Sequence, residues 1–150
     1  MTFLNTAHEV LRSGQWSLAA DKATLDYDGR FVRRKRITTD SGASVLVDLH
    51  ETTNLAPGDA LRLASGKLVE IAAAEEPVVV IRGANLPRLA WHIGNRHTPC
   101  QVNLDHLLIR RDHVLEAMLV QLGAEITFAI LPFRPEGGAY GHGRTMGHDH

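Results

Sequence analysis

Apolar residues in the first half of the chain come in short runs that turn signals separate. The turn signals are four dipeptides that end in glycine: Asp28-Gly29, Ser41-Gly42, Pro57-Gly58 and Ser65-Gly66. Breaks at roughly 8- to 12-residue intervals are typical of all-β structure. The pattern predicts strands at residues 24–27, 31–38, 44–49, 60–63 and 68–73. We therefore expect residues 1–76 to form a small all-β domain.

A change of composition marks the end of this region. Residues 72–77 consist of three alanines, two glutamates and Pro77, with no β-branched or aromatic side chain. Such a segment is typical of a connection between structural elements. We predict a short linker or a domain edge here, with the domain boundary near residue 76.

Hydrophobic positions in the second half alternate between strand-like and helix-like spacing. Residues 78–81 are continuously apolar, as in a buried strand. The next segment has Asn85 as a helix cap and Gly94 as a helix stop. Its apolar residues recur at helical spacing, at Leu86, Leu89, Ala90 and Ile93.

The remaining elements complete a recognisable order. Two short strands are predicted at residues 101–103 and 107–110, then a helix between Asp112 and Gly123, and a last strand at residues 125–131. The order β-α-β-β-α-β is the ferredoxin-like arrangement. We therefore expect an α+β protein in which residues 77–135 form a ferredoxin-like domain.

The last segment, residues 136–150, contains five glycines and little apolar bulk. Because it has little surface to bury, we expect a flexible tail unless something binds it. It carries His142, His148 and His150, with Asp149 between the last two. Several nitrogen and oxygen donors on one short segment favour metal chelation, although an expression tag is the alternative explanation.

Charge and hydropathy exclude several classes of partner. The formal net charge is -1, from 16 basic and 17 acidic side chains, so neither nucleic acid nor an anionic membrane is an expected partner. The basic run at residues 33–36 alternates between two strand faces, which favours a partner-protein surface or a charged edge strand.

No run of about 18 apolar residues and no secretory signal is present, so we expect a cytoplasmic protein.

Nine histidines are the unusual part of the composition, since imidazole is the commonest protein ligand for divalent transition metals. His97 follows the predicted helix stop and precedes a proline, which places it on a loop. His113 lies in the first turn of the second helix and is either a second metal ligand or an ordinary surface residue. Cys100, the single cysteine, excludes a disulfide framework and remains a possible soft ligand.

Two segments resemble the UreE family of urease accessory proteins. These are the stretch from Trp91 to His97, which ends in Gly-Asn-Arg-His and is followed by Thr-Pro, and the stretch from Phe128 to Tyr140, which contains Pro-Glu-Gly-Gly-Ala-Tyr. The segment Arg111 to Leu119 and the histidine-bearing tail also match. The first half agrees in size and type but has no sharp motif.

The resemblance implies a nickel metallochaperone and not an enzyme. It implies an N-terminal domain that binds partner proteins, a homodimer formed through the ferredoxin-like domain, and a central Ni²⁺ ligand at His97 from each protomer. The tail histidines would add ligands, and the partners would be a urease accessory GTPase and the urease assembly complex. Arg111 stands where some relatives have a histidine, which weakens the case for a peripheral site at His113.

Two other functions fit the same residues. A zinc or copper buffer would use the same imidazoles, because such sites follow the Irving-Williams order and bind Zn²⁺ or Cu²⁺ in vitro. A metal-dependent hydrolase would need His97 and His113 as ligands and a carboxylate base, for which Asp112 and Glu116 are the nearby candidates.

Overall fold

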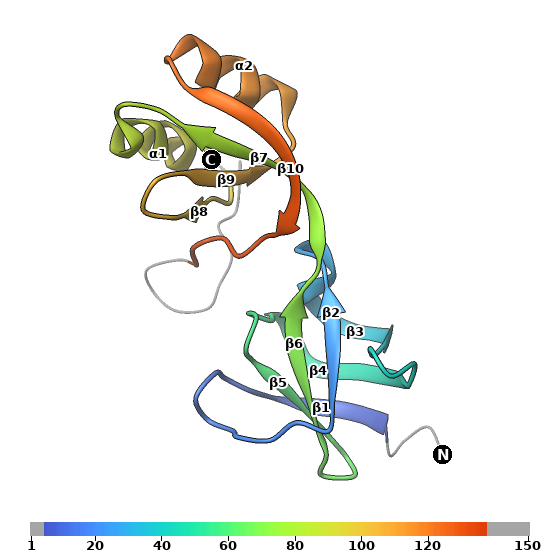
Figure 1. Ribbon diagram of the computed structural model, residues 1–150. Coiled ribbons are helices and arrows are strands. Elements are labelled where there is room, and N and C mark those ends of the chain that lie inside the picture. Colours follow the sequence, from blue (N-terminus) through green and yellow to red (C-terminus); the bar gives the residue numbers. More distant parts are fainter. Residues whose placement is uncertain (1–4, 138–150) are drawn as a thin grey trace. The chain divides into compact units, whose positions relative to one another are not determined.

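The computed structural model describes residues 5–137 and divides the chain into two compact units, residues 1–74 and 75–150 (Figure 1). The first unit is a six-stranded sheet, and the second is a four-stranded sheet with two helices. The predicted α+β class is therefore confirmed. The predicted flexible tail, apart from its first two residues, lies outside the described residues. No helix among the described residues is long and apolar enough to cross a membrane.

The first unit contains six strands and a short 3₁₀ helix, η2 (Asp28–Arg30). The strands are β1 (Thr6–Leu11), β2 (Asp21–Leu25), β3 (Phe31–Thr38), β4 (Ser44–Asn54), β5 (Ala60–Leu63) and β6 (Leu68–Ala73). They lie in the order β2-β6-β5-β1-β4-β3, with β1 parallel to β4 and β2 parallel to β6. Alternate residues such as Val45, Val47 and Leu49 of β4 fill the core.

Three strands of this unit differ from the prediction. The sequence pattern missed β1, whose adjacent His8 and Glu9 are polar, although β1 lies between β4 and β5. The strand predicted at residues 24–27 corresponds to β2, which begins three residues earlier and ends two residues earlier. Strand β4 continues five residues beyond its predicted end. The extension of β4 follows a register shift, after which Asn54 pairs with Phe31. Pairing between strands distant in sequence thus set these limits.

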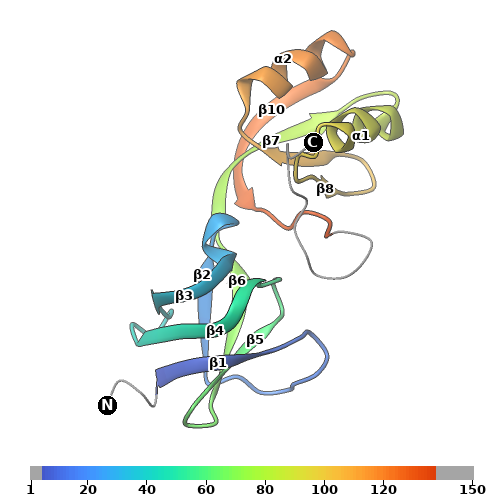
Figure 2. The same ribbon diagram turned by 180° about the vertical axis from the view of Figure 1, so that it is seen from behind.

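The second unit has the predicted order of strands and helices. The elements are β7 (Glu75–Arg82), α1 (Leu86–Asn95), β8 (Gln101–Val102), β9 (Leu107–Arg110), α2 (His113–Gln121) and β10 (Glu125–Pro132). The strands lie in the order β10-β7-β9-β8, and all neighbours are antiparallel. This is the split-βαβ arrangement. Figure 1 and Figure 2 show both helices on the same side of the sheet.

One apolar layer joins these helices to the sheet. Leu89 and Ile93 of α1 and Leu115 and Leu119 of α2 pack with alternate residues of β7 and β9, such as Val79. The predicted caps, Asn85 and Asp112, both accept hydrogen bonds from backbone N–H groups in the first turn of their helices. Helical spacing and caps therefore agree with the structure in this unit.

Of the two alternatives for residues 72–77, the linker is wrong, and the division between the two units falls inside this segment. Residues 72 and 73 finish β6, and β7 already begins at Glu75, so only Ala74 lies between the two strands. Pro77 is tolerated inside β7 because only β10 pairs with that part of the strand, and pairing with β9 begins at Val78. A proline at a position with one neighbouring strand can leave its missing N–H on the unpaired side.

Candidate metal site

His97 lies immediately after the end of α1 and has a left-handed backbone conformation, with φ of 59°. Its N–H donates to the carbonyl of Gly94 at 2.9 Å, and the N–H of Thr98 donates to the carbonyl of Ile93 at 3.4 Å. These two bonds form a Schellman motif, in which glycine normally occupies the left-handed position. The prediction that Gly94 ends the helix is wrong, since Gly94 lies inside α1 and His97 takes the terminating position.

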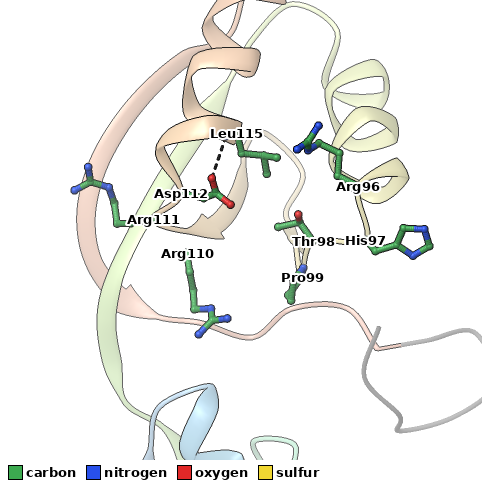
Figure 3. A pocket seen from close by; sticks show the side chains of 8 residues that line it. All are labelled: Arg96, His97, Thr98, Pro99, Arg110, Arg111, Asp112 and Leu115. Atoms are coloured by element: carbon green, nitrogen blue, oxygen red, sulfur yellow. Dashed lines mark hydrogen bonds between the residues drawn. The ribbon is translucent and has the colours of Figure 1, made fainter. Parts of the chain in front are cut away.

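A cleft of about 520 Å³ lies beside this helix end. Its walls are the segment after α1 and the junction of β9 with α2, and its lining residues are Arg96, His97, Thr98, Pro99, Arg110, Arg111, Asp112 and Leu115. Figure 3 shows the imidazole of His97 pointing away from the cleft. The His97 side chain is half-buried. Its ring therefore lies at the rim, where a group from outside the unit can reach it.

The junction of β9 with α2 is held by a compact set of polar contacts. Asp112 Oδ1 accepts hydrogen bonds from the N–H groups of Val114 at 3.0 Å and Leu115 at 3.1 Å. The carboxylate of Glu116, which is buried, accepts from the Asp112 N–H at 2.8 Å and from Arg111 Nε at 3.1 Å. This reciprocal arrangement resembles a capping box and fixes the start of α2.

Electrostatics at Glu116 favour its charged form. Burial acts to raise the pKa of Glu116, but the hydrogen bonds from Arg111 and from the Asp112 backbone outweigh it, so the pKa lies below its usual value. The Arg111 guanidinium also lies over the ring of Phe128, 3.8 Å from the ring centre. Arg111 therefore has a structural role at the start of α2.

Two of the predicted metal ligands, His97 and His113, lie within the described residues, and the structure does not bring them together. His113 is exposed at the first residue of α2 and does not line the cleft beside His97. Within residues 5–137, no group of three or more His, Cys, Asp or Glu side chains could hold a metal ion. The other three candidates, His142, His148 and His150, lie outside the described residues. A complete metal site would therefore need ligands beyond those that residues 5–137 of one chain bring together.

Cys100 is partly buried in the second unit. It packs against the core of the second unit, and burial, together with the charge of Glu136, raises the pKa of its thiol to about 12. The thiol is thus protonated near neutral pH in the absence of a metal, whereas nucleophilic attack requires the thiolate. His92 is half-buried and has an edge-to-face contact with Trp91, with ring centres 5.0 Å apart.

The arginines of the cleft are the feature that sequence analysis missed. Arg96 follows α1, whereas Arg110 ends β9 and Arg111 comes next in the chain. A helix end and a strand end meet only in the folded unit, so the spacing of these residues gave no signal. The motif Gly-Asn-Arg-His did include Arg96, but only as a neighbour of His97.

Comparison with known proteins shows the family. Residues 5–74 match the family model for the N-terminal domain of the UreE urease accessory protein. Residues 76–150 match the family model for its C-terminal domain. The chain belongs to the UreE family of urease accessory proteins. Family membership gives it a role in urease maturation as an accessory protein and not as an enzyme. The hydrolase alternative is thereby set aside.

Individual UreE relatives match along nearly the whole chain. The urease accessory protein UreE of Rhodobacter capsulatus is 58% identical over 150 residues, covering 100% of this chain and 96% of the relative. The UreE of Cereibacter sphaeroides is 59% identical over 151 residues, covering 100% of this chain and 82% of the relative. The UreE of Ruegeria pomeroyi is 54% identical over 147 residues, covering 98% and 99%.

Proposed function

We propose that this UreE-family chain carries Ni²⁺ for assembly of the urease active site, with His97 of each of two protomers as the central ligands. The observation that carries the proposal is the backbone of His97. A non-glycine residue in the left-handed region is disfavoured by about 1–2 kcal/mol, and such residues concentrate at functional sites. With this backbone conformation the imidazole lies at the rim of the second unit, where two copies could share one ion.

Further ligands are needed to complete such a site. Two imidazoles provide only two nitrogens, and we propose that His142, His148 and His150 of the tail supply others. Exposed His113 is proposed as a peripheral ligand. Imidazole sites also bind Zn²⁺ or Cu²⁺ in vitro, because affinity generally follows the Irving-Williams order. Selection of nickel would then depend on the partner that receives the ion.

The proposed partners follow from the role in urease maturation. We propose that the chain works in the cytoplasm as a homodimer formed through residues 77–135, and that residues 1–76 bind partner proteins. The receiving complex would contain a urease accessory GTPase, which the resemblance to the UreE family implies. The tail, residues 136–150, would move metal between the dimer and that complex.

Calorimetry with Ni²⁺ tests the ligand assignment. We expect His97→Ala to remove the tightest site, which should bind one ion per dimer in the unchanged chain. His50→Ala is the matched control, since His50 is an exposed histidine of the first unit and should leave nickel binding unchanged. An unaltered tight site in His97→Ala would exclude His97 as the central ligand.

Reconstitution of urease separates a nickel carrier from a general metal buffer. Nickel-loaded chain should activate metal-free urease in the presence of the accessory proteins, and His97→Ala loaded with the same amount of nickel should not. If free Ni²⁺ buffered to the same concentration activates urease equally well, the chain is a buffer and not a carrier.

A further inference from the structure

Strand β3 carries four consecutive basic residues. Arg33, Arg34, Lys35 and Arg36 are all exposed, although the formal net charge of the whole chain is -1. Arg34 forms an ion pair with Asp48 of β4, with Nη1 and Oδ2 3.0 Å apart. The other three form no ion pair with any residue in the range 5–137. Strand β3 therefore carries positive charge that the described part of the chain does not neutralise.

Two of these three side chains contact uncharged groups, and the third makes no polar contact within the same range. Arg33 Nη1 donates a hydrogen bond to the carbonyl of Leu49 at 3.4 Å, and Arg36 Nη1 donates to Ser44 Oγ at 3.0 Å. Lys35 has no hydrogen-bond partner within residues 5–137. A guanidinium group has five N–H donors and an ammonium group has three, so each of these side chains can still bind a carboxylate.

Strand β3 is also an edge of its sheet. It is the last strand in the order β2-β6-β5-β1-β4-β3, and among the described strands it pairs with β4 alone (Figure 2). The Thr39 N–H donates to the carbonyl of Ala43 at 2.8 Å, which fixes the phase of the antiparallel ladder. Because successive residues alternate in direction, the backbone groups of Lys35 point to β4, and those of Arg34 and Arg36 point away from it.

The open part of this edge has defined ends. A register shift between Val32 and Arg34 places a bulge at Arg33, and a bulge interrupts pairing. At the other end, the Asp40 N–H donates to the carbonyl of Lys22 at 2.7 Å, so β2 covers the edge there. Residues 34–38 lie between these two points and offer outward N–H and C=O groups to another strand.

Charge selects the kind of strand that can pair with this edge. A second copy of β3 would bring basic side chains against basic side chains, which is one way in which edge strands avoid self-association. An acidic strand would instead place carboxylates opposite the basic residues. Nucleic acid fits less well, because Arg34 and Arg36 lie on one face of the strand and Lys35 on the other, whereas a nucleic-acid surface gathers its basic residues on one face.

We propose that residues 34–38 of β3 bind an extended acidic segment of a partner protein, which adds to the six-stranded sheet as a further edge strand. The backbone of that segment pairs with the outward groups of β3, and its carboxylates lie beside Arg34, Lys35 and Arg36. This inference gives the chemistry of a partner for residues 1–76 and in that respect rests on the proposed function, but it requires no metal.

A peptide titration of the metal-free, full-length protein tests this edge. The probe is the blocked peptide Thr-Glu-Thr-Glu-Thr-Glu-Thr, and its counterpart has glutamine in place of each glutamate. We expect the acidic peptide to shift the NMR signals of residues 34–38. The glutamine peptide should bind roughly fivefold more weakly, because cross-strand pairs of opposite charge are lost. Binding of the acidic peptide should also weaken as salt rises from about 50 to about 500 mM, since exposed charges are screened.

Amide hydrogen exchange distinguishes strand addition from contact through side chains alone. In the protein without peptide, the amide of Lys35 should exchange slowly because it bonds to β4, and the amides of Arg34 and Arg36 should exchange fast. With acidic peptide at about ten times its dissociation constant, exchange at Arg34 and Arg36 should slow about tenfold, because only the unbound fraction exchanges. Unchanged exchange at both residues with the peptide bound would overturn strand addition.

A double variant, Lys35→Gln with Arg36→Gln, removes two of the charges that have no ion-pair partner in the described chain. It should bind the acidic peptide roughly fivefold more weakly than the unchanged protein does. Arg62→Gln with Lys67→Gln is the matched control, since it removes the same charge from exposed positions in and next to β5, which β1 and β4 separate from β3. The control should bind the peptide with unchanged affinity.

Several results would overturn the proposal. These are no binding of the acidic peptide, equal affinity for the acidic and glutamine peptides, and equal weakening in the two double variants. Tighter binding of a single-stranded oligonucleotide with three phosphates would also overturn it, because β3 would then be a general polyanion surface. If the variant at Lys35 and Arg36 does not fold, the comparison of the two peptides on the unchanged protein still decides.

Nickel measurements keep this proposal apart from metal carriage. The variant at Lys35 and Arg36 should keep the tight nickel site, and His97→Ala should bind the acidic peptide with unchanged affinity. If the peptide binds β3 but the chain has no tight nickel site, the proposed metal role fails and the edge surface stands. If the nickel site is present and the peptide does not bind, the edge surface alone fails.

Discussion

At the scale of single residues, the two helices of the second unit provide an internal comparison. Both end in a Schellman motif, but the left-handed position is Gly123 after α2 and His97 after α1. Among residues 5–137, His97 is the one non-glycine residue with positive φ. Glycine would satisfy the backbone better, which supports the proposal that the imidazole is there for metal binding and not for folding.

We predict that His97→Gly is more stable than His97→Ala by about 1 kcal/mol, although both variants lose the imidazole. The two share the loss of all side-chain contacts beyond the β-carbon, so the difference reports mainly the left-handed backbone. Urea unfolding of the metal-free variants measures it. Gly123→Ala, at the matching position of α2, should lose a similar amount. Equal stability of His97→Gly and His97→Ala would show that the backbone at residue 97 is unstrained.

Candidate residues were found from the sequence to the extent that they belong to local patterns. The Gly-Asn-Arg-His motif drew attention to His97, and the helix cap at Asp112 was read correctly. The role of Arg111 depends on Phe128 and Glu116, and only the fold brings Phe128 to it. Local patterns therefore identify individual residues, whereas a shared cleft requires tertiary structure.

At the scale of elements, hydrophobic spacing predicted β3, β5, β6 and β9 with the same limits as the structure. It failed where another strand decides the outcome. Strand β1 has only a weak alternating pattern, and the glutamates and proline at the start of β7 resemble a linker until β10 pairs with them. Such pairings join residues far apart in the sequence, so no local window contains the information.

The start of α2 gives a pH-dependent prediction. The pKa of Glu116 is lowered in the folded state, so its stabilising contribution is present above the ordinary pKa of a glutamate, near 4.5, and is lost as pH falls through the lower folded value. Glu116→Gln should reduce the free energy of unfolding by about 1 kcal/mol at pH 7, because a buried charge-assisted contact is weakened. It should also flatten the acid side of the stability profile.

Chemical denaturation of both proteins from pH 7 to pH 3 provides the measurement. The difference between wild type and Glu116→Gln should shrink as the pH drops below about 4.5. Glu125→Gln, an exposed position at the start of β10, serves as the control and should show little change. A constant difference across this range would mean that Glu116 acts by packing and not by charge.

At the scale of the whole molecule, each unit has its own sheet and its own buried core. The first core contains residues from β1 to β6, and the second contains residues from β7, β9, β10 and both helices. Because the second core is complete without the first, we predict that a fragment of residues 75–150 folds and keeps the tightest nickel site. Residues 1–74 alone should fold without binding nickel tightly.

Circular dichroism and nickel calorimetry on the two fragments test that division. Cooperative unfolding of both fragments is the expected result, with metal stoichiometry in residues 75–150 equal to that of the full chain. Addition of the first fragment to the second should leave nickel affinity unchanged. A fragment of residues 75–150 that is folded but lacks the tight site would place a required ligand in the first unit.

The last prediction concerns residues 141–150 and the number of ligands around the ion. A Ni²⁺ ion usually takes about four to six ligands, so two His97 imidazoles leave positions that His142, His148 and His150 can fill. A Gly-rich chain of 17 residues, the number after Phe133, spans roughly 20 Å on average, comparable to the radius of a small domain. Either tail could therefore reach an axis between two copies of the second unit.

Closing such a loop costs entropy, which limits affinity but lets tail imidazoles dissociate one at a time as the ion passes to a partner. Deletion of residues 141–150 should thus lower nickel affinity or the number of imidazoles bound, while the dimer and the two His97 ligands persist. Calorimetry, X-ray absorption and sedimentation of the truncated protein measure these three quantities. A triple substitution of His142, His148 and His150 by alanine keeps the length of the tail and should reproduce the effect. If both variants retain the affinity and imidazole count of the full chain, the tail histidines are not part of the site.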